Sequence, residues 1–496
     1  MHTGIFERPR LAKAGLLSLS DFSGGEASAF PLTSTPPKFS ALLQNCMYQA
    51  GRMKKIPGYS KVNAATCGVE LKSGFEFRKI DGTAMILVAG GGKIFKNIGG
   101  VLTEEKTGLD NAAIVSFASH NNLCLAVNGV DASMKTTDGV NWTALGGTPP
   151  ATSFKIHVHK GRVWHLERTN KMLATHSALN NPEDYTTAND AGYIDFKFVL
   201  KKGDELMDIF TYLGYLVFVF RNHIAVYSGQ TPSGVNSNFV LVELREIGTN
   251  ATGTIQGLGQ DSAFLTVSGV KSFQQVLQTG NLNVKSLSEA IDPDLLGELK
   301  TASAFASAHY LKRNWYLLKV GSIVHIYDYV NKCWTRMVGA DVSGMFTTAD
   351  GILYLCGNGF LYLYDDGWDF AGTLPIWIWR LSWLNLMRDG RKAEPKIIQL
   401  TAEPDQEIDI EVQIAYDLNN PKSENIQTII LQPSNVTLID SVTDFDAIDP
   451  FDEILYSETR IPLFGSGRIA QIQFKNTSNK PVNIVDIVLQ VIPGGF

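Results

Sequence analysis

Three histidines close together in the sequence, His157, His159 and His165, are the first candidates for metal chemistry. His157 and His159 are two residues apart, so on a β-strand both side chains point to one face and could bind one zinc ion. No cysteine or carboxylate at a recognisable spacing completes a ligand set. Strand histidines with ordinary hydrogen bonds are therefore the favoured interpretation, and we expect no metal site.

An acidic run between Asp440 and Glu453 holds the most closely spaced carboxylates. Its acidic side chains are Asp440, Asp444, Asp446, Asp449, Asp452 and Glu453. The run lacks the central glycine and terminal glutamate spacing of an EF-hand calcium loop, so a solvated acidic loop is favoured. Residues 401–460 hold 14 acids and two bases, whereas the whole chain has a net charge of −6. This region is therefore expected to repel polyanions.

Motifs that carry known catalytic mechanisms are missing from the sequence. It contains no GxxxxGK[ST] phosphate loop, no GxSxG nucleophile turn and no HExxH zinc motif. The glycines Gly90 to Gly92 fall in an expected hairpin turn, so no helix N-terminus follows them to bind a phosphate. We expect no catalytic residues, no cofactor and no enzymatic activity.

A repeated pair of strands is the element that positions these residues. An apolar strand, a short polar turn and a second strand recur seven times, with spacings from 37 to 53 residues. The first strands begin at Met85, Leu123, Val163, Leu216, Phe264, Tyr316 and Leu353, and partner strands such as SFQQV follow 8 to 10 residues later. A repeat of this length with several strands per unit predicts an all-β fold, a β-propeller of six to eight blades.

One turn inside the repeat resembles a known structural motif. The stretch TTDGVNW, from Thr136 to Trp142, is similar to the Asp-box turn of sialidase-like propellers, although it is one residue shorter. An Asp-Gly turn with Trp142 packed beneath it is the favoured interpretation. A sialidase would also need an arginine cluster. Whether Arg162, Arg168, Arg221 and Arg245 converge is left open by the sequence.

Three parts of the chain differ in pattern. Residues 1–65 are rich in Gly, Pro and Ser and predict an extended arm with little regular structure, apart from a helical turn around residues 37–49. Residues 66–372 carry the propeller repeat, in which CWTRM suggests a fourth blade strand. Residues 373–496 read as five or six longer strands and predict a β-sandwich-like platform domain. The best helix candidate is the segment LSEAIDPDLLGEL.

Bulk properties limit the compartment and the partners. Hydrophobic residues make up 44% of the chain and charged residues 19%, as in folded, soluble proteins. The five cysteines are scattered and form no CxxC pair, which favours buried thiols in a reducing compartment. The N-terminus lacks the apolar run of a signal peptide, and no window is long and apolar enough to span a membrane. We expect a protein that is not exported by the usual route and that does not contact a membrane.

The segments outside the repeat resemble a virion protein family. DFSGGEASAFPL (Asp21 to Leu32), LLQNCMYQAGRMKKIPGY (Leu42 to Tyr59) and GSGRIAQIQFKNTSNKPVNIVDIVLQVIP (Gly465 to Pro493) are similar to the opening and close of the tail nozzle, or tail tubular, proteins of short-tailed phages, also called packaged-DNA stabilisation proteins. The matching residues are Phe22, Gly24, Gly25, Asn45, Gly51, Pro57, Gly58, Tyr59, Gly467 and Arg468.

The resemblance implies a structural protein of the virion tail, assembled in the host cytoplasm. It implies a homohexameric ring below the head-to-tail adaptor and portal complex, carrying tail fibre, spike or needle proteins, with the propellers projecting outward as fins. Genome DNA would pass through the lumen without sequence-specific contact. A conduit must not hold DNA by neutralising its phosphates, so the acidic run from Asp440 to Glu453 would suit a channel wall.

Two other functions remain open. The chain could be a glycan-binding or sialidase-like propeller, for which TTDGVNW and the aromatic-rich turns are the only support. It could also be a scaffold propeller that recruits host proteins. Oligomeric state separates these hypotheses from the tail nozzle hypothesis, because only a tail nozzle protein is required to form a ring.

Overall fold

The computed structural model describes residues 15–31, 33–200, 203–279, 286–387, 390–404, 406–421, 425–432 and 457–493. Their contacts divide the chain into two compact units. One, the propeller unit, consists of Pro57–Val330 and Val338–Thr373. The other, the platform unit, consists of the described parts of Met1–Ile56, Asn331–Met337 and Leu374–Phe496.

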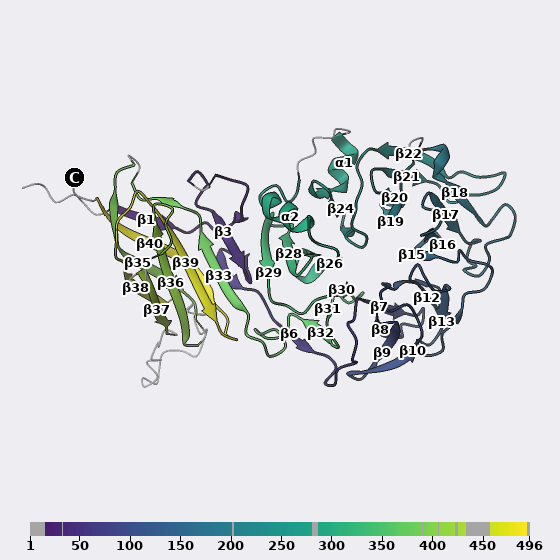
Figure 1. Ribbon diagram of the computed structural model, residues 1–496, viewed down its shortest axis with the longest axis horizontal. Coiled ribbons are helices and arrows are strands. Elements are labelled where there is room, and N and C mark those ends of the chain that lie inside the picture. The colour runs from purple at the N-terminus through teal and green to yellow at the C-terminus, as the bar shows by residue number, and fades with distance from the viewer. Residues whose placement is uncertain are drawn as a thin grey trace, which may run out of the picture. The chain divides into compact units, whose positions relative to one another are not determined.

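In the described residues the propeller unit contains seven antiparallel blades, six of them separate small sheets, which follow one another around a ring (Figure 1). The first four blades are β7–β10 (Ser73–Arg78, Ala84–Gly90, Lys93–Ile98, Val101–Lys106), β11–β14 (Ser116–His120, Leu123–Val127, Met134–Thr136, Thr143–Ala144), β15–β18 (Ser153–His159, Arg162–Glu167, Leu173–His176, Gly192–Asp195) and β19–β22 (Leu206–Tyr212, Tyr215–Phe220, Ile224–Ser228, Val240–Arg245). The fifth is β23–β25 (Gln256–Leu258, Asp261–Thr266, Gly269–Ser272), and the sixth contains β26–β28 (Phe305–Tyr310, Trp315–Val320, Ile323–Asp328). The predicted β-propeller is confirmed.

The seventh blade closes the ring with a strand from the start of the chain. It contains β30 (Gly344–Thr347), β31 (Leu353–Cys356) and β32 (Leu361–Tyr364), and β6 (Tyr59–Lys61) pairs antiparallel with β32. Its inner strand, β30, contacts the inner strands of the first and sixth blades, β7 and β26. The propeller unit therefore starts at Pro57, before the expected boundary at residue 66, because its closing strand precedes the first blade.

The second strands of the blades are largely buried because neighbouring blades stack on both of their faces. All six residues of β16 and of β27 are buried. Between the third and fourth blades, Trp164 of β16 packs edge-on against Phe218 of β20, with ring centroids 5.5 Å apart. Continuous burial explains why these segments do not alternate between apolar and polar residues.

Two short helices accompany the fifth blade. Helix α1 (Phe273–Thr279) begins directly after β25, so the expected partner strand SFQQV is wrong: its first residue ends the strand and the others are helical. Helix α2 (Asp292–Leu299) lies inside the segment expected to be helical. Glu298 of α2 binds His325 of β28 at 2.7 Å, which fixes the helix to the next blade. None of the helices in the described residues is long and apolar enough to cross a membrane.

The platform unit is a sandwich of two sheets, as expected for the C-terminal part. One sheet has the order β38 (Ser457–Pro462), β35 (Ala393–Ala402), β40 (Asn483–Pro493), β5 (Arg52–Lys55), β4 (Cys46–Gln49), with β1 (Gly15–Leu19) also paired to β40. The other contains β29 (Cys333–Met337), β3 (Phe39–Gln44), β33 (Ile376–Leu381), β39 (Ile469–Thr477), β36 (Ile408–Tyr416) and β37 (Ile426–Leu431), with β2 (Gly25–Glu26) on β3 and β34 (Leu384–Asn385) on β39.

The inner faces of these two sheets form one hydrophobic core. It includes Ile398 of β35 and Leu489 of β40 from one sheet, and Trp379 of β33, Val412 of β36 and Phe474 of β39 from the other. Residues alternate between buried and partly exposed along β39 and β40, as required of strands with one face in a core.

The N-terminal segment corrects two expectations. Residues 15–61 form β1 to β6 instead of an arm with little regular structure. The expected helical turn around residues 37–49 is formed by β3 and β4, because this short apolar run fits either period and β3 has hydrogen-bonded neighbours on both sides. The segment CWTRM, suggested as a fourth blade strand, forms β29 and belongs to the platform unit, where Arg336 pairs with Gln44 of β3.

Candidate functional site

The candidate histidines of the third blade are held by hydrogen bonds, some within this blade and some to the fourth blade. His157 Nε2 and His159 Nδ1 both contact the Thr211 hydroxyl, at 2.8 and 2.9 Å, and burial lowers the pKa of each imidazole to about 4. His165 contacts the hydroxyls of Ser153 and Tyr185, and burial lowers its pKa to about 3. The described residues contain no group of three or more potential metal ligands. The three histidines are therefore neutral parts of a hydrogen-bonded blade.

The Asp-box-like stretch forms a turn between β13 and β14. Asp138 Oδ1 accepts hydrogen bonds from the backbone N–H groups of Val140 and Asn141, both at 2.8 Å, and from the Thr136 hydroxyl at 2.9 Å. These donors hold the pKa of the Asp138 carboxyl well below its usual range. Trp142 packs against Phe117, with ring centroids 6.4 Å apart. The carboxylate is occupied by its own turn, so it holds the hairpin and is not available to a substrate.

The four arginines that a sialidase site would need are engaged separately. The contacts are Arg162 to Asp190 at 2.6 Å, Arg221 to Glu205 at 2.6 Å, Arg245 to Glu243 at 2.6 Å, and Arg168 over the ring of Phe154 at 4.6 Å. No two of these arginines share a partner among these contacts. They do not form one anion-binding cluster.

Four residues of the phage-like opening fix the backbone of the platform unit. Phe22 packs edge-on against Trp379 of the core, with ring centroids 4.7 Å apart. Gly25 has a φ of +72°, and a Cβ at this position would lie 2.6 Å from the Cβ of Cys333. Gly24 is closed in by the ring of Phe39. Asn45 has a φ of +56° and donates a hydrogen bond from its side chain to the Ile376 carbonyl at 2.8 Å.

A buried ion pair lies beside these residues and was not foreseen from the sequence. The side chain of Glu26 is 1% exposed and binds the Arg336 guanidinium through both carboxylate oxygens. Glu26 Oε2 also accepts a hydrogen bond from the Leu43 N–H at 3.1 Å. Thr335 adds hydrogen bonds from its hydroxyl to the Leu43 and Cys46 carbonyls. These contacts join β2, β3 and β29, which are far apart in the sequence.

The remaining motif residues have structural roles as well. In the propeller unit, a Cβ on Gly58 would lie 2.0 Å from the Asp369 carbonyl oxygen, and Tyr59 stacks on Phe370 with ring centroids 5.0 Å apart. Pro57 precedes this pair and is buried. In the platform unit, Gly51 occupies the turn between β4 and β5 at a φ of +79°.

The close of the phage-like sequence borders a small hollow in the platform unit. The hollow has a volume of about 320 Å³ and lies between the end of β36 and residues 465–466. A Cβ on Gly467 would lie 3.0 Å from the Cβ of Tyr416, and the backbone N–H of Arg468 donates to Asp417 Oδ1 at 2.7 Å. Gly467 and Arg468 thus stabilise the turn that precedes β39.

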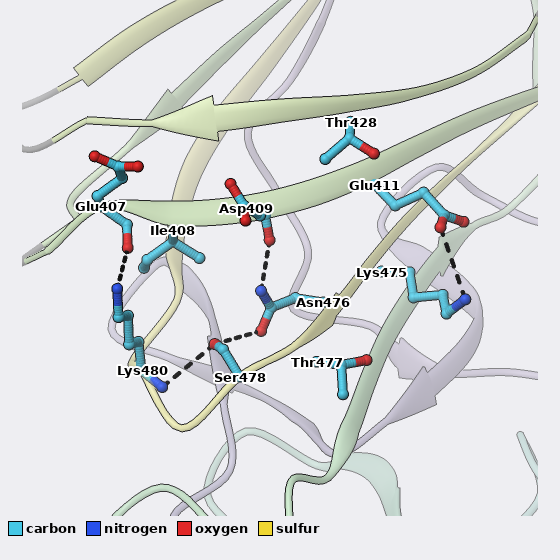
Figure 2. Close-up of a pocket in the computed structure, with 10 residues that line it drawn as sticks. All are labelled: Glu407, Ile408, Asp409, Glu411, Thr428, Lys475, Asn476, Thr477, Ser478 and Lys480. Carbon is cyan, nitrogen blue, oxygen red and sulfur yellow. Dashed lines mark hydrogen bonds and ion pairs between the residues drawn. The ribbon is translucent and has the colours of Figure 1, made fainter.

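A polar pocket of about 290 Å³ lies on the outer face of the second platform sheet (Figure 2). Its carboxylates come from β36 and its lysines from β39 and the following turn. Lys475 lies 3.8 Å from Glu411, and Lys480 donates to the Glu407 carbonyl at 2.7 Å. Asn476 bridges to the Asp409 carbonyl and accepts from the Ser478 hydroxyl at 2.9 Å. These contacts join residues 407–411 to β39 and to the turn that follows it.

The largest of these hollows is the axial cavity of the propeller, with a volume of about 540 Å³. Residues from the starts of inner strands line it, including Ser73 of β7, Phe154 and Lys155 of β15, and Phe305 of β26. In an antiparallel blade the start of the first strand lies at the same end as the turn after the second strand. Arg168, which follows β16, therefore reaches the same end of the cavity.

We did not predict this cavity from the sequence, although the repeat contains the information needed to locate it. The repeat allows the blades to be aligned, and the residues that begin each inner strand face the axis. An alignment of the blades does not show which of these side chains already have hydrogen-bond or ion-pair partners.

The six acidic candidates from Asp440 to Glu453 lie outside the described residues, so their expected place on a channel wall remains a prediction.

Family models and curated protein sequences give no match to this chain. Similar solved structures include YCF48 from Cyanidioschyzon merolae, at 12% identity and a TM-score of 0.40, covering 62% of this chain and 98% of that one. The WD40 β-propeller domain of Doa1 is similar at 11% identity and a TM-score of 0.39, covering 62% and 96%. BamB from Moraxella catarrhalis is similar at 9% identity and a TM-score of 0.37, covering 66% and 94%. The likeness concerns the fold alone.

Proposed function

We propose that this chain is a structural component of a short phage tail. In this proposal it forms a ring below the head-to-tail adaptor, which retains packaged DNA and conducts it during ejection. The observation that carries the proposal is the place of the phage-like opening residues in the structure. Phe22, Gly25 and Asn45 determine how the N-terminal strands join the sandwich, and Gly58 and Tyr59 determine how the propeller closes.

These positions support the proposal because each has a physical need for its residue type. Gly25 and Asn45 adopt left-handed backbone conformations, which side chains other than glycine and asparagine rarely tolerate. Gly58 touches a backbone carbonyl, a contact that no side chain permits. A motif made of such positions marks a shared architecture more specifically than a composition match would.

The engagement of the polar candidates also favours a non-catalytic role. In the described residues the candidate histidines, Asp138 and three of the four arginines bind structural partners within their own blade or the next one. A sialidase-like function has no specific observation in its favour, because its arginines do not meet.

Imaging the full chain alone and mixed with its portal–adaptor complex tests the proposal. We expect sixfold rings in negative stain, either alone or on the adaptor. The proposal is wrong if the chain stays a monomer, does not bind the adaptor and cleaves a fluorogenic sialoside. Arg313→Met serves as a control variant for the imaging, because its ion pair with Asp365 lies within the propeller unit.

The acidic run gives a second test, based on its sequence alone. Replacing Asp440, Asp444, Asp446, Asp449, Asp452 and Glu453 by their amides raises the net charge of residues 401–460 by six. If these residues keep a conduit from binding DNA, the variant should bind duplex DNA more tightly at low salt than the parent. Equal affinity of both proteins would remove the acidic run from the proposal.

A further inference from the structure

The axial cavity of the propeller combines charged and apolar groups that its own structure leaves unused. Its lining includes three cations, Lys72, Lys155 and Arg168, and the carboxylate of Asp110. The apolar part of the rim includes Ile114 and Val130, which are 54% and 57% exposed. Exposed β-branched side chains beside cations, in a hollow, are typical of ligand sites.

Among the described residues, two of the three cations have no carboxylate partner. Lys155 forms an ion pair with the buried Asp208 at 2.9 Å. Lys72 donates to the Ala112 carbonyl at 3.3 Å, and Arg168 lies over the Phe154 ring. Within the described part of the chain neither Lys72 nor Arg168 forms an ion pair.

In the described residues the acid in the lining, Asp110, forms no ion pair with these cations. Asp110 Oδ1 accepts hydrogen bonds from the backbone N–H groups of Ala112 and Ala113, both at 2.9 Å. Its carboxylate therefore holds the link between the first and second blades. The cavity keeps an excess of positive charge at one end.

The cavity wall is also preorganised. Gly129 has a φ of +83°, and a Cβ there would lie 2.9 Å from the Cβ of Phe154 and 3.2 Å from the Cγ of Arg168. Glycine thus allows the turn after β12 to pack directly on the Phe154–Arg168 pair. Ser73 also lines the cavity, and its buried hydroxyl has no hydrogen-bond partner among the described residues.

We propose that this end of the propeller cavity binds an acidic peptide segment of a partner protein, with an apolar side chain entering the hollow and carboxylates meeting Lys72 and Arg168. A peptide fits because it supplies carboxylates for Lys72 and Arg168 together with an apolar side chain for the hollow. A small anion would leave Ile114, Val130 and Phe154 uncovered. The site is independent of whether the platform unit forms a ring.

Fluorescence anisotropy with three labelled heptapeptides tests this proposal on the full chain. Each peptide carries a central leucine and phenylalanine, flanked by aspartate and glutamate, by serine, or by lysine. We expect the acidic peptide to bind at least tenfold more tightly than the serine peptide at low salt, and to weaken as salt is added. The proposal is wrong if the acidic and serine peptides bind equally.

Variants locate the binding. Lys72→Gln with Arg168→Gln should weaken the acidic peptide at least tenfold, whereas Lys312→Gln, an exposed lysine in the turn at the opposite end of the sixth blade, should not change it. The Lys72→Glu, Arg168→Glu variant should bind the lysine peptide more tightly than the acidic peptide. A variant that had simply unfolded would bind neither peptide. Val130→Glu, at an exposed position, should weaken the acidic peptide without affecting the fold.

Two competitors separate a peptide site from a site for small anions. Sialyllactose and inorganic phosphate are titrated into the complex with the acidic peptide. We expect neither to displace it at concentrations far above that of the peptide. The peptide proposal is overturned if the parent protein binds sialyllactose or phosphate but not the acidic peptide, and if the Lys72→Gln, Arg168→Gln variant loses that binding. Peptide binding that survives this double substitution overturns it as well.

Discussion

Each of the seven blades of the propeller unit is folded mostly from consecutive residues, whereas each sheet of the platform unit gathers strands from distant parts of the chain. In the platform, Ile484 pairs with Met53, and Arg336 pairs with Gln44. In the propeller, the paired strands of a blade follow one another along the chain, except for β6, which closes the last blade. Contacts at large sequence separation form late and slowly.

Because of this difference, a local destabilisation should spread less far in the propeller unit than in the platform unit. A propeller blade can be destabilised with its neighbours still in place, because each blade contacts mainly the next one. The platform depends on single contacts that join three segments, such as Glu26 with Arg336. We therefore expect point substitutions at such junctions to affect the platform as a whole.

The largest expected effect is that low pH lowers the stability of the propeller unit, through its histidines, and not that of the platform unit. Eight of the nine histidines in the chain lie in residues 57–330, and the ninth is His2. Burial lowers the pKa of His159 and His176 to about 4 and that of His165 to about 3. The unfolded chain, with histidine pKa values near ~6.5, therefore binds more protons below that pH.

Stability from these histidines is fully present above pH ~6.5 and falls as the pH drops toward 4. We expect the propeller to lose on the order of 5 kcal/mol between pH 7.5 and 4.5, after allowance for screening. Hydrogen exchange with mass spectrometry, corrected for its intrinsic pH dependence, can follow each unit separately. Equal destabilisation of the platform peptides would break the comparison.

The next effect concerns ion pairs of different burial. Arg336→Met leaves Glu26 buried without its partner and should cost about 3–5 kcal/mol. In the propeller, Arg313→Met removes a pair with Asp365 whose side chains are 20% and 24% exposed, and should cost about 1 kcal/mol. Urea unfolding of both variants measures the difference. Similar costs would mean that Glu26 finds water or another partner.

A smaller contrast comes from two glycines with positive φ. Gly25→Ala must resolve a 2.6 Å approach to Cys333 in addition to the left-handed backbone, so we expect about 2–4 kcal/mol. Gly99→Ala, in a propeller turn with no atom within 4 Å of its Cβ, should cost only about 1–2 kcal/mol. Thermal unfolding of the two variants tests this, and equal shifts would contradict the packing argument.

The smallest expected effect is at the Asp-box-like turn. Asp138→Ala removes the acceptor of the Val140 and Asn141 N–H groups and should cost about 1 kcal/mol. Because the turn has no other role in this account, adaptor binding should not change. A loss of adaptor or glycan binding in this variant would give the turn a function that its hydrogen bonds do not suggest.

Local patterns were enough to predict the propeller. Apolar strands with polar turns, such as the pair starting at Met85, gave seven strand pairs and a prediction of six to eight blades, because most strands of a blade pair with their neighbour in the sequence. SFQQV was misassigned because a short apolar run fits a helix or a strand, and here a helix follows β25.

The platform was predicted less completely for a physical reason. The pattern of residues 373–496 indicated a sandwich, but nothing local reveals that β29, from within the repeat, joins it through Arg336. The same holds for β3, which takes its partners from remote strands. In the axial cavity, the partners of Lys72 and Arg168 were equally hidden, because they depend on which side chains the blades bring together.

The most direct test of the central claim, that the platform assembles and the propeller is an appended fin, is the oligomeric state of the full chain with its portal–adaptor complex. Cryo-electron microscopy of the mixture should show six copies in one ring, and Arg336→Met should reduce ring formation far more than Arg313→Met. A chain that remains monomeric beside the adaptor, or rings that Arg336→Met and Arg313→Met weaken equally, would contradict the account.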